Sequence, residues 1–147
     1  MLLVNARSGR TIASDVELAV TRAERRRGLL GRDSLAPSAA LVISPCWSIH
    51  TAFMRFPIDA VFVDRSGQAV RIVRDLAPWR IAVAPRAHAV VELPAGSLAA
   101  HDVRIGDDLH LEPGGATDTR PGEDAGVRPW AATTRTGVVP PPRAATS

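Results

Sequence analysis

Lysine and tyrosine are absent from the 147-residue sequence, and cysteine occurs once, as Cys46. All 18 basic residues other than histidine are therefore arginines, and the formal net charge is only +3. So small an excess does not generate the large positive field of a nucleic-acid-binding protein. The single basic cluster, residues 25–27, falls on a predicted helix, where consecutive side chains point in different directions. We therefore predict no nucleic-acid partner.

One cysteine cannot form an internal disulfide, and this composition fits a reducing cytoplasm. We expect Cys46 to be a small buried hydrophobe rather than a nucleophile. No apolar run approaches the roughly 20 residues of a membrane helix, and residues 1–7 have neither the charge nor the length of a secretion signal. These absences predict a cytoplasmic monomer without membrane insertion.

Residues 47–64 are the most apolar part of the chain, and they contain all three phenylalanines. Within residues 58–63, alternate side chains would point to opposite sides of a strand, and both sides are mostly apolar. This pattern is typical of a strand that is covered on both faces. Asp59 lies at the start of this strand, and Pro57 before it cannot donate a backbone hydrogen bond. We expect strand pairing to begin after Pro57.

Three separated motifs carry a family resemblance. They are HT at 50–51 with MRFPID at 54–59, ERRRGLLGR at 24–32, and VELPAG at 91–96 with IGD at 105–107. Together they resemble the widespread prokaryotic family called domain of unknown function 192 (DUF192), over roughly residues 10–112. The resemblance implies a compact, mainly antiparallel β fold of the sandwich or jelly-roll kind, with short helices. It implies no reaction.

The rest of the chain alternates short apolar runs with turn residues, which predicts a mainly β domain over residues 1–112. We expect a β-sandwich, a jelly roll or a partly closed barrel with one or two short helices. Residues 11–20 read as one half-exposed strand. A helix over residues 22–30 should begin with a capping box formed by Thr21 and Glu24 and end at Gly31, with Gly28 inside it.

Residues 113–147 differ in composition, being rich in glycine, proline, alanine and threonine. They contain too few large apolar side chains to offset the chain entropy lost on folding, so we predict a disordered tail. Residues 140–142 should adopt polyproline II. An alternative is that the tail contacts a protein partner, with Trp130 as its anchor.

No motif of established chemistry is present, whether a phosphate-binding loop, Rossmann glycines, a zinc-protease helix or paired cysteine ligands. We therefore predict no cofactor and no metal. Asp59 and Glu92 occupy buried strand positions, where an unpaired carboxylate is costly. Either Arg32, Arg55 or backbone amides stabilise them, or raised pKa values fit them for acid–base chemistry.

A shallow cleft lined by Phe53, Met54, Phe56 and Trp79 would provide the apolar surface of a ligand site. We favour a small binding or accessory module without enzymatic activity. Its predicted ligand-binding residues are Arg32, His50, Thr51, Met54, Asp59 and Glu92. Two alternatives stay open. One is a hydrolase or metal-dependent enzyme that uses Asp59 and Glu92, and the other is a protein-interaction component of a larger assembly.

Overall fold

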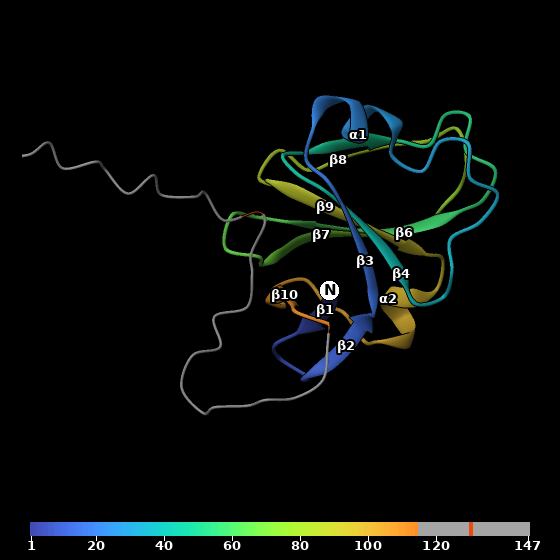
Figure 1. The fold of residues 1–147 in the computed structure, drawn as a ribbon. Helices are drawn as coiled ribbons and strands as arrows, with labels where there is room; N and C mark the ends of the chain where they lie inside the picture. Colours follow the sequence, from blue (N-terminus) through green and yellow to red (C-terminus); the bar gives the residue numbers. More distant parts are fainter. Residues whose placement is uncertain (115–129, 131–147) are drawn as a thin grey trace, which may run out of the picture.

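The centre of the fold is a five-stranded sheet (Figure 1). The computed structural model describes residues 1–114 and 130. In spatial order the strands of the central sheet are β3 (Asp15–Ala19), β4 (Ala39–Ile43), β9 (Ala89–Pro94), β6 (Ile58–Val63) and β7 (Ala69–Leu76). Every residue of β4 and β6 is buried, as is all of β9 except its last residue. The strand over residues 58–63 is thus covered on both faces, as predicted.

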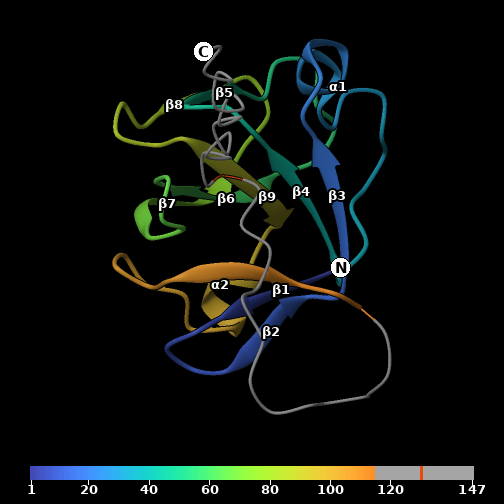
Figure 2. The same ribbon diagram turned by 60° about the vertical axis from the view of Figure 1, so that its left-hand side comes forward.

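Smaller layers cover the two faces of this sheet (Figures 1 and 2). A three-stranded sheet of β1 (Leu2–Asn5), β2 (Arg10–Ala13) and β10 (Leu109–Glu112) lies on one face, together with helix α2 (Ser97–Ala100). The other face carries the two-stranded sheet of β5 (Ser48–His50) and β8 (Ile81–Val83) together with helix α1 (Arg22–Arg27). Each covering layer encloses its own hydrophobic core.

The first core, between the central sheet and the sheet of β1, β2 and β10, is built on Val42, Val61, Val91 and Leu93 of the central strands. The second core, on the other face of the central sheet, is built on Ile43, Ile58, Phe62 and Val90. Consecutive residues of one strand belong to different cores because side chains alternate across a sheet. The face on which a polar residue lies therefore decides which core it enters.

The predicted mainly β fold is confirmed, and the described residues form two short helices where one or two were predicted. Neighbouring strands are antiparallel except β3 and β4, which run parallel and are joined through α1. Within residues 1–114 the strands form three separate sheets and no closed barrel. None of the helices in this part of the chain is long and apolar enough to span a bilayer.

Two local predictions are wrong. Residues 11–20 form two strands, because Ser14 separates β2 in the outer sheet from β3 in the central one. The helix ends at Arg27, and Gly28 is its C-cap, with φ of 48°, rather than an interior residue. The capping box is confirmed, since the Glu24 amide donates to Thr21 Oγ1 at 3.2 Å and the Thr21 amide donates to Glu24 Oε2 at 2.9 Å.

Trp130 is fully buried and belongs to the first core, although it lies beyond the predicted domain end at residue 112. Its indole packs against Gly67, which has φ of +91° in the turn before β7. A Cβ atom at Gly67 would come within 2.5 Å of the Trp130 Nε1 atom and of the Leu109 carbonyl oxygen. The predicted disorder of the tail and the polyproline at 140–142 concern residues outside the described ones.

Candidate functional site

The two buried carboxyl groups point to opposite faces of the central sheet. Asp59 is fully buried and Glu92 is 4% exposed. In the pairing of β6 with β9, Asp59 lies opposite Leu93, and Ala60 lies opposite Glu92. Asp59 therefore shares the face of Leu93 and enters the first core, whereas Glu92 shares the face of Ala60 and enters the second. The structure does not bring these residues together as an acid–base pair.

Asp59 stabilises the backbone. Its Oδ1 accepts a hydrogen bond from the Asp75 amide at 3.0 Å, and its Oδ2 accepts one from the Leu98 amide at 2.9 Å. Asp75 has a positive φ of 50° at the end of β7, where the register with β6 shifts. Of the partners considered for Asp59, the backbone amides are therefore the ones observed. Arg55 instead pairs with Asp33.

Thr51 also has a structural role, which is to join the end of β5 to the loop before β8. The side chain is fully buried. Its Oγ1 donates to the Ala77 carbonyl oxygen at 2.6 Å and accepts from the Arg80 amide at 2.9 Å. The Thr51 amide donates to the Arg80 carbonyl oxygen at 2.8 Å. Through these bonds Thr51 orders the loop between β5 and β8, and it is not among the residues that line the cavity described below.

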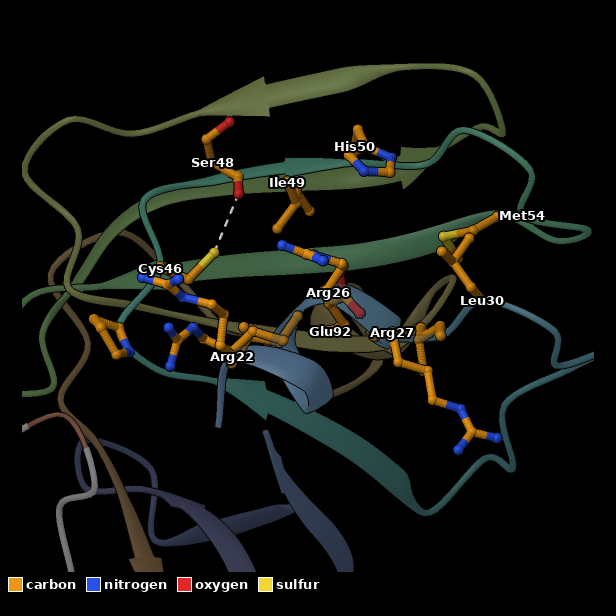
Figure 3. A pocket seen from close by; sticks show the side chains of 15 residues that line it. Arg22, Arg26, Arg27, Leu30, Cys46, Ser48, Ile49, His50, Met54 and Glu92 are labelled. Carbon is orange, nitrogen blue, oxygen red and sulfur yellow. Dashed lines mark hydrogen bonds between the residues drawn. The ribbon is translucent and has the colours of Figure 1, made fainter. Parts of the chain in front are cut away.

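A cavity of about 300 Å³ lies between α1, β5 and β9, and it brings together three of the predicted residues (Figure 3). These are His50, Met54 and Glu92. Apolar side chains line much of the rest, including Leu29, Ile43 and Ile49. The volume is at the small end of the range for small-molecule sites.

Glu92 is the buried acid of this cavity. Its Oε2 atom has no hydrogen-bond partner in the described part of the chain. Burial raises the pKa of Glu92 to about 7, and the nearby Arg32 guanidinium opposes this rise. Arg32 does not bind Glu92 directly, because its two terminal nitrogens donate to the Glu17 carboxylate at 2.9 and 2.7 Å. Glu92 is thus a buried acid whose Oε2 atom is satisfied by no atom of residues 1–114 or 130.

The arginines of α1 also line this cavity, a placement that we did not predict from the sequence. Arg22, Arg25, Arg26 and Arg27 all line it, and none of them is buried. Figure 3 shows Arg26 extending into the space between α1 and Ile49, while the Arg27 guanidinium points outward. The only sequence signal was the run of three arginines, which also fits a solvated helix.

Cys46 lines the cavity as a thiol. Its Sγ donates to the Ser48 carbonyl oxygen at 3.1 Å, and burial raises its pKa. A thiol in this state is a weak nucleophile, because the thiolate is the reactive form. His50 is exposed on β5, opposite Ile81 of β8. Within residues 1–114 and 130, no group of three His, Cys, Asp or Glu side chains could hold a metal ion.

The aromatic residues predicted to line a cleft are separated. Phe53 and Trp79 are 73% and 60% exposed, and their ring centroids lie 4.6 Å apart. Both residues have positive φ angles, 63° and 64°, which are uncommon for bulky side chains. Met54 is buried beside the cavity, and Phe56 packs against the second core. The two loops thus present an exposed aromatic pair that the sequence did not predict.

The Glu92→Gln variant is expected to change how stability depends on pH. Because the pKa of Glu92 is about 7 in the folded chain and has an ordinary value of 4.5, the folded state retains a proton that the unfolded chain releases. The stability that protonated Glu92 contributes to the fold is therefore fully present below about pH 4.5 and is lost as the pH rises through about 7. The loss is on the order of 3 kcal/mol.

Urea unfolding of wild type and variant between pH 4.5 and 8 measures this effect. Glutamine cannot ionise, so the variant should gain stability relative to wild type as pH rises. A constant difference across the range would contradict the assignment. The other carboxyl groups are common to both proteins and cancel in the comparison.

Comparison with known proteins places the chain among uncharacterised relatives. The model of the family described as DUF192, Uncharacterized ACR, matches residues 3–111. A UPF0127 protein of Thermococcus sibiricus is 33% identical over 121 residues, which are 76% of this chain and 75% of that protein. A UPF0127 protein of Pyrococcus furiosus is 32% identical over 114 residues, which are 73% of this chain and 95% of that protein.

Two solved structures have a similar fold. One is a Sinorhizobium meliloti protein described as a candidate transcription regulator, with 28% identity and a TM-score of 0.64 over 74% of this chain and 89% of that one. The other is a Novosphingobium aromaticivorans protein of unknown function, with 23% identity and a TM-score of 0.66 over 76% of this chain and 84% of that one. At 23% identity, the second match concerns the fold alone.

Proposed function

The chain belongs to the DUF192 family of uncharacterised proteins, and we propose that it is a small ligand-binding module whose site is the cavity between α1, β5 and β9. Family membership supplies no reaction, so the proposal rests on the geometry of the site. It keeps the binding function expected from the sequence, but it changes the set of residues that would contact a ligand.

The unpartnered Oε2 atom of Glu92 is the observation that carries this proposal. Burying a polar group without a hydrogen bond costs about 1–3 kcal/mol. A structural carboxyl such as Asp59 avoids this cost by accepting two backbone amides. Glu92 has no comparable role, yet it opens into a cavity large enough for a small molecule. A bound ligand would supply the missing hydrogen-bond partner.

The predicted site residues divide into two groups on this proposal. Glu92, His50 and Met54 contact the ligand, because they line the cavity. Thr51 and Asp59 hold the surrounding backbone through their hydrogen bonds. Arg32 acts on Glu92 only through its charge.

The hydrolase alternative has less support. It requires Asp59 and Glu92 to face one substrate, but the sheet separates them. The Cys46 thiol has no base that would activate it as a nucleophile, because its hydrogen bond goes to a backbone carbonyl. Binding therefore remains the function that these residues support best.

A cytoplasmic location and a monomeric state also remain our proposals, as does a protein partner that binds the tail. The free thiol of Cys46 supports the cytoplasmic location. The packing of Trp130 in the first core bears on the proposed protein partner of the tail. A partner that used this indole as an anchor would first have to release it from the core.

Ligand-induced stabilisation tests the proposed site. Wild type and the Glu92→Leu variant would be heated with a panel of small acids, amines, alcohols and sugars. We expect at least one class to raise the melting temperature of wild type by several degrees and to leave that of Glu92→Leu unchanged. Without ligand, Glu92→Leu should be the more stable protein near pH 8, because it buries no charge.

Glu112→Leu is the matched control, since Glu112 is a carboxylate of β10 in the outer sheet, on the opposite side of the central sheet from the cavity. It should respond to ligands as wild type does. Failure of every compound to shift the wild-type melting temperature would refute the proposed function. An equal shift in wild type and Glu92→Leu would also refute it.

A further inference from the structure

We infer that the cavity binds a small organic anion, a carboxylate or a phosphate monoester, whose charged end meets the arginines of α1 and one of whose oxygens accepts a hydrogen bond from the carboxyl group of Glu92. This inference rests on the proposed function and names the class of its ligand.

Within residues 1–114 and 130, no carboxylate pairs with the arginines Arg22 and Arg26 at the cavity. No hydrogen bond or ion pair joins Arg22 or Arg26 to another residue within the described part of the chain. The one acidic residue of the helix, Glu24, is engaged, because its carboxylate accepts the amides of Val20 and Thr21 in the capping box. Arg32 and Arg7, by contrast, each pair with a carboxylate. Guanidinium groups without such partners favour carboxylate and phosphate ligands.

The charged and titratable groups that line the cavity with Glu92 are cationic or neutral. Glu17 of β3 lies on the same face of the sheet but is paired with Arg32. Helix α1 supplies its arginines, the loop after it supplies Arg32, the segment before β5 supplies the Cys46 thiol, and β5 supplies His50. No second carboxylate lines the cavity. A cationic ligand would have to pass the arginines and find Glu92 ionised, so the surroundings favour an anion.

Glu92 suits an anion because it can be a donor. Burial raises its pKa to about 7, so most of the carboxyl keeps its proton in mildly acidic solution. A protonated carboxyl donates one hydrogen bond, whereas a carboxylate only accepts. Its exposure is 4%, so water does not compete freely for this donor. An anionic oxygen would satisfy the group that the protein leaves unpaired.

The remaining walls limit the rest of the ligand. Leu29, Ile43, Ile49 and Met54 are apolar and line the cavity beside Glu92. A volume of about 300 Å³ is at the small end of the range for small-molecule sites, so it suits a compact ligand. The expected ligand therefore has a short apolar body and one anionic end.

Calorimetric titration of the full chain with four matched probes tests this inference. The probes are butyrate, propyl phosphate, the neutral butyramide and the cationic butylamine, each at pH 6 and pH 8. We expect one or both anions to bind at pH 6 and the neutral and cationic probes to bind at least about tenfold more weakly. Whichever anion binds more tightly identifies the carboxylate or the phosphate class.

Two variants separate the contribution of the arginine charges from that of the Glu92 hydrogen-bond donor. Butyrate affinity should fall about tenfold or more between pH 6 and pH 8 in wild type, because Glu92 loses its proton and gains a like charge. Glu92→Gln keeps an N–H donor and cannot ionise, so its affinity for butyrate should fall less with pH than that of wild type. Propyl phosphate itself gains a charge in this range, so it is compared between the two proteins at a single pH. The double variant Arg22→Gln, Arg26→Gln should lose about tenfold or more in affinity at both pH values.

The matched control is Arg10→Gln, Arg65→Gln, which removes the same charge from outside the cavity. It should bind as wild type does. Tighter binding of butylamine, especially at pH 8, would overturn the inference in favour of a cation site. Preference for butyramide, or unchanged anion affinity in Arg22→Gln, Arg26→Gln, would also overturn it while leaving the proposed function intact. No binding of any probe, together with no thermal shift in the wider panel, would refute both.

Discussion

Replacing Asp59 by alanine is expected to lower the free energy of unfolding by about 3–5 kcal/mol. The carboxylate accepts two backbone amides, from Asp75 and Leu98, in a site with no solvent exposure. Alanine would leave the buried Leu98 amide and the part-buried Asp75 amide without this acceptor, and it would remove the link from β6 to the end of β7 and to α2. Urea unfolding at pH 7, followed by far-ultraviolet circular dichroism, measures the loss.

Asp59→Asn and Asp33→Ala are the control variants for this stability measurement. Asparagine retains one acceptor oxygen, so it should recover part of the stability. Asp33 pairs with Arg55 at a side chain that is 83% exposed, and its replacement should change stability by less than about 0.5 kcal/mol. An Asp59→Ala protein as stable as wild type would show that the two amide bonds contribute nothing. A stable variant that has lost ligand binding would make Asp59 a functional residue instead.

Replacing Trp130 by alanine is expected to destabilise the fold by about 3–5 kcal/mol. Trp130 is the largest of the fully buried side chains, and it packs against Gly67 in the first core. Its removal would leave a cavity bordered by the turn before β7 and by the Leu109 segment. Thermal and urea unfolding of the full-length variant would measure the effect.

Trp47→Ala is the matched control, because the same side chain there is 57% exposed. It should cost much less than Trp130→Ala. A chain that ends at residue 114 should lose about as much stability as Trp130→Ala, since both remove the same indole from the core. Equal stability of the Trp130→Ala and Trp47→Ala proteins would show that the indole is not part of the core in solution.

The strands of the central sheet could be predicted because their pattern is local. β4, β6 and β9 are apolar on both faces, so their burial shows in the sequence itself. The capping box could also be predicted, because Thr21 and Glu24 are three residues apart. The division of residues 11–20 into two strands could not be predicted. The alternating pattern continues across Ser14, although the chain passes from one sheet to another there.

The site was only partly predictable because it depends on register between distant strands. Alternation within one strand places Asp59 and Glu92 at inward positions, but it does not say whether those positions face the same core. The pairing of Asp59 with Leu93 settles this, and it joins residues 34 positions apart in the chain. The role of the α1 arginines depends likewise on where the helix docks. Composition alone does not distinguish arginines that line a cavity from arginines on a solvated surface.

The cavity has two walls of different rigidity. Glu92 is carried by β9, which is paired on both sides by β4 and β6. Helix α1 buries none of its residues and is held at its start by the Thr21–Glu24 capping box. On the proposed function, substitutions in α1 could therefore alter which ligands the cavity binds at little cost to folding, whereas substitutions in β9 would also disturb the central sheet. Ligand preference could then diversify through a single short helix while Glu92 beneath it stays in place.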